Sequence, residues 1–158
     1  MDPTSRCEHF HAITGSCAVL VTELPTDRGV VALVAIEGEI DLCSVGGVEQ
    51  VAHAALAEPP LHLVVDLAEM SFCDVRGLRL LATTLPREAR RTGVRYTLAE
   101  MPRHLAHLMA LVPPRDRPQQ RATTREALSI IASELLAAGS SGADLAPLNA
   151  AQHPRRNA

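Results

Sequence analysis

The sequence predicts one α/β domain in which about four helices pack against a mixed, mostly parallel sheet of four to five strands. Three observations support this: two adjacent β-rich segments near the amino end, alternating helical and strand-like periods after them, and a length of 158 residues, which is typical of one domain. The alternation carries most weight, because neighbouring parallel strands need a crossover connection that a helix usually provides.

The two β-rich segments, 17–24 and 30–36, are expected to form an antiparallel hairpin. Only the residues Pro-Thr-Asp-Arg-Gly separate them, a connection too short for a parallel crossover. Helical spacing of apolar residues follows in 45–56, and Pro59 with Pro60 ends this helix before the next strand.

The segment 61–81 predicts a buried strand, a tight loop and a capped helix in succession. Its apolar run up to Leu67 suits a strand that is covered on both faces. Asp74 can accept hydrogen bonds from the free backbone N–H groups of the next turn, after which leucines recur at helical spacing. Pro86 is expected to kink or split this helix near Ala82, because proline lacks a backbone donor and clashes with the preceding turn.

The rest of the chain continues the alternation. We expect a strand at 94–99, a short helix beginning near Pro102, and a short edge strand near 119–122. Thr123 and Glu126 have the spacing of a capping box and open a last amphipathic helix.

Both ends of the chain are polar or rich in small residues, with no sustained period. We therefore expect a flexible amino-terminal arm at 1–14, the domain at 15–138 and a flexible carboxy-terminal tail at 139–158. The amino end lacks the basic and apolar regions of a signal peptide, and the longest apolar run, 30–36, is far shorter than a membrane span. These features predict a cytoplasmic protein without membrane contact.

The composition excludes several classes of function. All 15 basic residues are arginine, so no lysine is present for Schiff-base chemistry or a P-loop. The aromatic fraction of 2% and the net charge of −3 disfavour binding to nucleic acid. Gly-rich phosphate loops and a G-x-S-x-G nucleophile motif are absent, so we expect no enzyme activity, no catalytic residue and no cofactor.

Cysteine and histidine give no strong sign of a metal site. The four cysteines form no C-x-x-C pair, which favours reduced thiols. The crowded group at residues 7–11 lies in the expected flexible arm, and the pair His104 and His107 lacks a third and fourth ligand, so we predict no metal at either place. Cys73, next to Asp74, is either a redox-sensitive thiol at a helix start or, more often in such a place, a small buried residue.

Several short motifs occur in a characteristic order. Gly38-Glu39-Ile40-Asp41 closes the second strand, Val64-Val65-Asp66-Leu67 forms the third, and Phe72-x-Asp74-x-x-Gly77-Leu78 follows it. Gly93 opens the next strand, and Glu126-Ala127-Leu128 lies in the last helix. In this order and spacing, over about 19–136, the chain resembles the STAS domain, the fold of bacterial anti-sigma factor antagonists.

The resemblance implies a regulator that acts by binding and not by catalysis. The typical antagonist of this family docks on a protein kinase that also serves as an anti-sigma factor, so that the sigma factor is released for transcription. The kinase resets this switch by phosphorylating a Ser or Thr directly before the glycine. Here the turn reads Asp74-Val75-Arg76-Gly77, so Arg76 holds the phosphoacceptor position and neither it nor Val75 can receive a phosphate.

We therefore predict a partner-binding site that is insensitive to phosphorylation at its usual position. Arg76 should point outward or pair with an acid, because a cation gains nothing from the positive end of a helix. Asp74 also has a purely structural explanation as a helix cap, and exposed charges flanking a loop would explain the carboxylates at the strand end. The predicted partner-binding residues are Glu39, Asp41, Asp74, Val75, Arg76 and Gly77.

Other functions stay open beside this one. The chain could be a nucleotide-sensing domain with the same architecture, or a structural subunit of a stress-signalling assembly, since a fold alone does not fix a function. The expected partners are a kinase-like anti-sigma factor or related STAS proteins, and a homodimer is a third arrangement to test.

Overall fold

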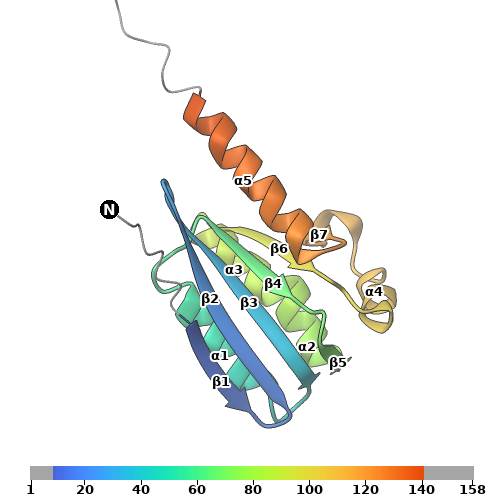
Figure 1. The fold of residues 1–158 in the computed structure, drawn as a ribbon. Coiled ribbons are helices and arrows are strands. Elements are labelled where there is room, and N and C mark those ends of the chain that lie inside the picture. Colours follow the sequence, from blue (N-terminus) through green and yellow to red (C-terminus); the bar gives the residue numbers. More distant parts are fainter. Residues whose placement is uncertain (1–8, 141–158) are drawn as a thin grey trace, which may run out of the picture.

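The computed structural model describes residues 9–140 and confirms the predicted mixed, mostly parallel sheet packed with helices (Figure 1). The strands lie in the order β1-β2-β3-β4-β6-β7, and β5 pairs with β3 outside this path. The first three strands are antiparallel, whereas β3, β4, β6 and β7 run parallel. The strands are β1 (His9–Thr14), β2 (Cys17–Thr26), β3 (Gly29–Ile40), β4 (His62–Asp66), β5 (Met70–Cys73), β6 (Arg95–Ala99) and β7 (Gln119–Arg121).

The strand count of seven corrects the predicted four to five. Two strands were missed. β1 forms from residues expected to lie in the flexible arm, because an edge strand needs only one neighbour and tolerates a mixed polar sequence. β5 forms in the predicted loop 68–73, beside the last residues of β3. The predicted edge strand near 119–122 is confirmed as β7.

The number of helices agrees with the prediction of about four, because α2, a π-helical turn and α3 follow one another without a break. The helical elements are α1 (Val45–Ala55), α2 (Val75–Arg79), the π-helical turn (Leu80–Thr84), α3 (Leu85–Arg91), α4 (Arg103–Met109), a short 3₁₀ turn (Pro114–Asp116) and α5 (Thr124–Ser140). The helix α5 therefore includes Gly139 and Ser140, the first two residues of the expected tail. The remaining tail residues 141–158, and residues 1–8 of the arm, lie outside the described residues.

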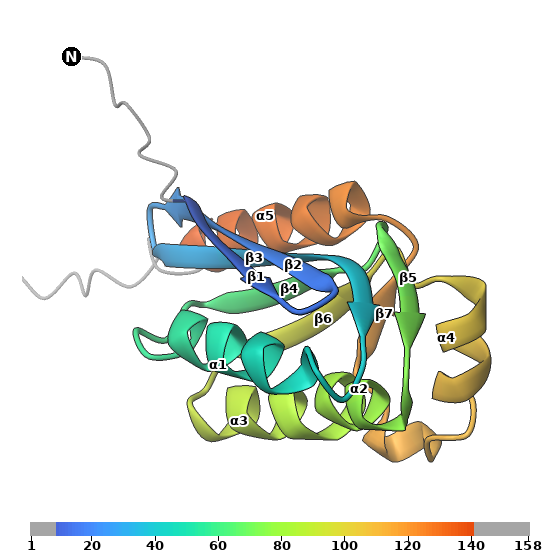
Figure 2. The ribbon, with the colours of Figure 1, turned by 90° about the horizontal axis from the view of Figure 1, so that it is seen from below.

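The sheet has two differently covered faces (Figure 2). Helices α1, α2 and α3 cover one face over a large aliphatic core that includes Val34, Ile36, Leu63, Leu81 and Leu98. Helix α5 packs on the other face over a smaller cluster. That cluster is formed by Val31, Val64, Ala99, Ala127 and Ile131. This asymmetry leaves part of the second face without a helix.

The predicted interruption of the long helix at Pro86 is confirmed as a π-helical turn. The carbonyl of Leu80 accepts a hydrogen bond from the N–H of Leu85, five residues later. Pro86 has no N–H to offer the carbonyl of Leu81, and the buried hydroxyl of Tyr96 donates to that carbonyl at 3.0 Å. Burial raises the pKa of Tyr96, so this hydroxyl keeps its proton.

The capping signals at the start of α5 act as predicted. The N–H of Glu126 donates to Thr123 Oγ1 at 3.0 Å, and Glu126 Oε2 accepts from the N–H of Ala122 at 3.1 Å. The hydroxyl of Thr124 donates to Asp66 Oδ2 at 2.7 Å, which ties the helix to the end of β4. Among residues 9–140, no helix is long and apolar enough to cross a membrane.

Candidate functional site

The candidate site is the turn that opens α2, at the carboxyl ends of the parallel strands. Asp74 Oδ1 accepts hydrogen bonds from the N–H groups of Arg76 and Gly77, each at 2.9 Å. The N–H of Asp74 donates to the carbonyl of Ile40 at 3.0 Å, which fixes the turn to the end of β3. The predicted cap is therefore confirmed, and it satisfies the backbone donors that a helix start leaves free.

Gly77 lets this turn pack closely on the sheet. A Cβ atom at this position would lie 2.6 Å from Cys73 Sγ and 2.7 Å from Ile40 Cγ2, both closer than van der Waals contact allows. Gly77 is itself buried. The glycine of the motif is thus a packing requirement, because only a residue without a side chain fits between the helix and the strand.

Glu39 and Asp41 lie at the same edge but in different roles. Asp41 Oδ1 accepts from the N–H groups of Ser44 and Cys43 at 3.0 and 2.9 Å. The hydrogen bond from the Ser44 N–H is the main reason that the pKa of Asp41 is lowered. Asp41 thereby shapes the loop that leads into α1, whereas the side chain of Glu39 is exposed beside Phe72 in the β3–β5 pair.

Residue 76, the expected phosphoacceptor position, carries a free cation. Arg76 is exposed, and its guanidinium makes no hydrogen bond or ion pair with any residue between His9 and Ser140. Of the two arrangements expected for Arg76, the structure therefore has the outward one. Val75 beside it is 75% exposed, which is unusual for a β-branched apolar side chain.

Two further apolar side chains at this edge were missed by the sequence analysis. Phe72 is 48% exposed on β5, and Leu42 is 64% exposed in the loop after β3. We call Glu39, Leu42, Phe72, Val75 and Arg76 the edge surface. It combines three exposed apolar side chains with one acid and one base, a composition that suits contact with another protein.

Cys73 is a packing residue and not a reactive thiol. It is buried, and burial raises the pKa of its thiol to about 12. His104 and His107 are both exposed on α4, and within the described part of the chain no group of three or more metal-ligating side chains comes together. Of the group at residues 7–11, Cys7 and Glu8 lie outside the described residues.

The comparison with protein families agrees with this geometry. A family model described as "Mlab, STAS domain" matches residues 25–112. The chain belongs to the STAS domain family.

Among curated proteins the chain is similar to the anti-sigma-F factor antagonist RsfB of Mycobacterium tuberculosis. The two are 36% identical over 64 residues, which make up 40% of this chain and 52% of RsfB. The chain thus spans about half the length of the curated relatives it matches.

Solved structures show the same fold at lower identity. An anti-sigma factor antagonist from Mycobacterium paratuberculosis is 23% identical with a TM-score of 0.52, over 84% of this chain and 99% of that chain. The anti-sigma factor antagonist SpoIIAA in its unphosphorylated form is 18% identical with a TM-score of 0.53, over 71% of this chain and 97% of that chain. These structures support the STAS fold.

Proposed function

We propose that this chain is a non-enzymatic regulator that acts as an anti-sigma factor antagonist and is not controlled by phosphorylation at residue 76. The observation that carries the proposal is the turn at Asp74. It keeps the cap and the close-packed glycine of the family motif, while Val75 and Arg76 expose no hydroxyl group. The similarity to RsfB supports the class of partner, an anti-sigma factor.

The proposed partner is an anti-sigma factor of the kinase-like type, and the proposed place of binding is the cytoplasm. The edge surface supplies the contact: Val75, Phe72 and Leu42 offer apolar area, and Arg76 offers a cation that an acidic group on the partner can pair with. Since the turn that presents these side chains is already ordered by Asp74, binding requires little rearrangement.

Changing Val75 to Glu is expected to weaken binding to a purified kinase-like anti-sigma factor by about tenfold or more, because it places a charge in the apolar centre of the contact. Calorimetry measures the affinity. The melting temperature should hardly change, since Val75 is mostly exposed.

The matched control is Leu136→Glu, an equally exposed leucine on α5. It should leave the affinity unchanged. Equal losses in the two variants, or no binding by the unaltered chain to any kinase-like anti-sigma factor of its own cell, would contradict the proposed function.

Restoring a hydroxyl at the turn tests the regulatory half of the proposal. With the partner kinase and ATP, Arg76→Ser is expected to gain a phosphate at residue 76, whereas the unaltered chain gains none in 71–77. Mass spectrometry of the tryptic peptides locates the modification. Arg79→Ser, at the exposed end of the same helix, is the control for a serine outside the turn. A phosphate on Ser71 of the unaltered chain would overturn the claim of insensitivity.

A further inference from the structure

The sheet face that carries α5 is only partly covered. The helix packs over β4, β6 and β7, and no helix among residues 9–140 lies over β1 and β2 on this side (Figure 1). Strand alternation places a row of apolar side chains on this uncovered area, which we call the open face. Its members are Ile13, Ala18, Leu20 and Ala35. Leu33, next along β3 on the same face, packs against the cluster under α5.

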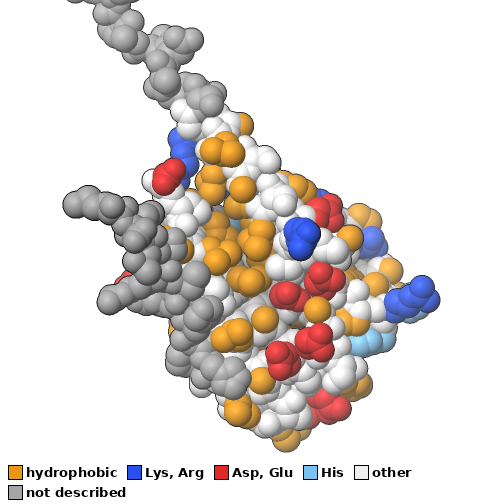
Figure 3. All heavy atoms as spheres, viewed as in Figure 1, with side chains coloured by type: hydrophobic (Ala, Val, Ile, Leu, Met, Phe, Trp, Pro, Cys, Tyr) orange, Lys and Arg blue, Asp and Glu red, His pale blue; other side chains and the backbone are white. Residues whose placement is uncertain are grey.

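The side chains of the open face are apolar but remain partly exposed to solvent. Leu20 and Ala35 are neighbours in the β2–β3 pair and only half-buried, and Ile13 on β1 is 74% exposed. In Figure 3 hydrophobic side chains gather beside α5, and acidic side chains gather toward the carboxyl ends of the strands. A contiguous apolar area of this kind usually has an occupant.

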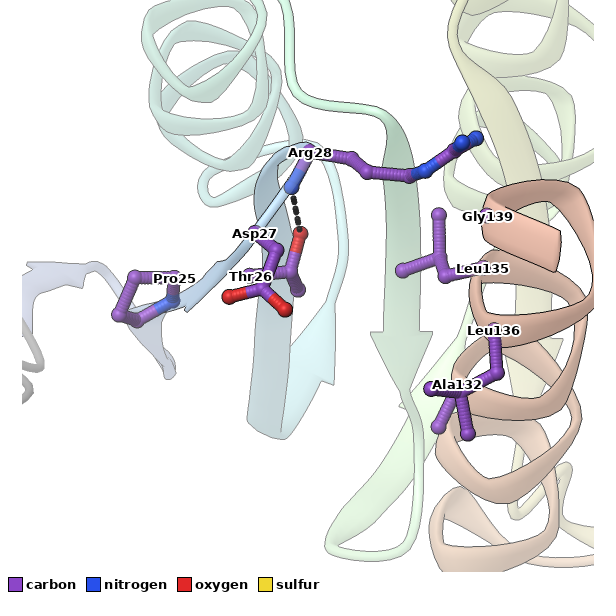
Figure 4. A pocket seen from close by; sticks show the side chains of 8 residues that line it. All are labelled: Pro25, Thr26, Asp27, Arg28, Ala132, Leu135, Leu136 and Gly139. Carbon is purple, nitrogen blue, oxygen red and sulfur yellow. Dashed lines mark hydrogen bonds between the residues drawn. The ribbon is translucent and has the colours of Figure 1, made fainter. Parts of the chain in front are cut away.

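A cavity lies at the end of α5, beside the hairpin that joins β2 and β3. The cavity, of about 610 Å³, lies between the tip of the β2–β3 hairpin and the helix, and Leu135, Leu136 and Gly139 line its helical side (Figure 4). Arg28 Nη2 donates to the carbonyl of Ala138 at 2.9 Å and holds the helix end against the hairpin. The chain therefore leaves α5 at the mouth of this cavity.

The opposite end of the open face is acidic. Glu37 and Glu39 lie on this face of β3, and the carbonyl of Glu69 accepts a hydrogen bond from the N–H of Gly38 between them. The three carboxylates are exposed and make no ion pair with any residue that the structure describes. An occupant with an apolar middle and a basic end would match this arrangement.

We propose that the open face binds the chain's own segment 141–158. This segment begins at the cavity, carries Leu145 and Leu148 in its first half, and has the adjacent bases Arg155 and Arg156 near its end. From the hairpin tip to Glu37 the strand β3 extends about 26 Å, at ~3.3 Å per residue. About fifteen residues separate Ser140 from Arg155, enough to span up to ~50 Å. The leucines then cover the open face and the arginines reach the three free carboxylates.

Thiol labelling tests this occupancy. In the full chain, a cysteine introduced as Ala35→Cys should react with a maleimide about fivefold more slowly than in a chain ended after Ser140, because the site is covered most of the time. Peptide mass spectrometry separates this thiol from the native cysteines. The control Ala57→Cys, an exposed position after α1, should react equally in both lengths of chain.

Two variants of the full chain sharpen the result. Leu145→Asp combined with Leu148→Asp should label as fast as the shortened chain, whereas Asn149→Asp, which adds charge without removing apolar area, should not. Adding a synthetic 141–158 peptide to the shortened chain should slow labelling again.

Equal labelling of full and shortened chains overturns the proposal. So does protection that disappears on dilution together with a dimer in sedimentation, because a second copy would then be the occupant.

Discussion

Replacing Gly77 with alanine is expected to lower the free energy of unfolding by about 2 kcal/mol, the usual cost of overpacking a close contact. The new Cβ would overlap with Cys73 Sγ and with Ile40, whose β-branched side chain is buried in the strand and cannot turn away. The gain in helix propensity from glycine to alanine offsets only part of this. Urea denaturation measures the difference.

Gly46→Ala is the matched control for this substitution. Gly46 also lies in a helix, but nothing lies within 4 Å of the Cβ that it would acquire. Alanine there is expected to stabilise the protein by about 0.5 kcal/mol through helix propensity alone. If Gly77→Ala stabilised the protein as Gly46→Ala does, that result would contradict the close packing of the α2 turn on β3.

The protein is expected to lose about 3 kcal/mol of stability between pH 7 and pH 4 through the single side chain of His62. His62 is 3% exposed, and burial lowers its pKa from 6.5 to about 4, with a further contribution from the nearby Arg95. Between these two values the unfolded chain binds a proton that the folded chain does not. Stability is therefore complete above pH 6.5 and falls as the pH drops toward 4.

The neutral form of His62 also suits its hydrogen bonds. His62 Nε2 lies 2.8 Å from Thr97 Oγ1, and that hydroxyl donates in turn to Gln119 Oε1 at 3.3 Å. Because the Thr97 hydroxyl donates its proton to Gln119, it accepts in the bond with His62, and His62 Nε2 is the donor. A second ring proton would find no partner described at this buried site.

Urea denaturation at several pH values between 4 and 7 measures the effect. His62→Gln keeps a donor for Thr97 and should remove most of the slope in this window, whereas His104→Gln, at an exposed position, should retain it. Glu134, whose pKa is lowered from 4.5 by its hydrogen bond from Arg95, begins to lose its contribution near the acid end of this range, and Asp41, whose pKa is lowered from 3.8, does so at still lower pH. An unchanged slope in His62→Gln would show that another group controls the acid sensitivity.

Those parts of the fold that depend on local chemistry could be predicted from the sequence. The cap at Asp74, the break at Pro86 and the capping box at Glu126 each depend on residues a few positions apart. The arrangement of β1 and β5 could not be predicted in this way. Each is recognised only through its pairing with another strand, and the pairing of the short β5 with β3 is itself irregular between Gly38 and Glu39.

The capped turn at the candidate site could be predicted from the sequence, but the exposed apolar side chains around it could not. The motif located Asp74 to Gly77, because its spacing is local. Phe72 and Leu42 were missed as exposed residues, since an apolar side chain in a strand or loop gives no sign of which face it occupies until the pairing is known. The same limit applies to the hydrogen bonds that link His62, Thr97 and Gln119. These residues are brought together only by the parallel sheet.

The π-helical turn at 80–84 also controls the direction in which Val75 and Arg76, the helical part of the edge surface, point. A π turn is equivalent to one extra residue within an α-helix, and each residue advances a helix by about 100°. The helix beyond the turn is held by Leu85 and Ala89 in the core, and Val75 and Arg76 lie before it. Without the extra residue, the same sequence would present these two side chains about a quarter of a turn away. Helical phase, as well as the side chains that the turn carries, thus sets what the proposed contact surface presents.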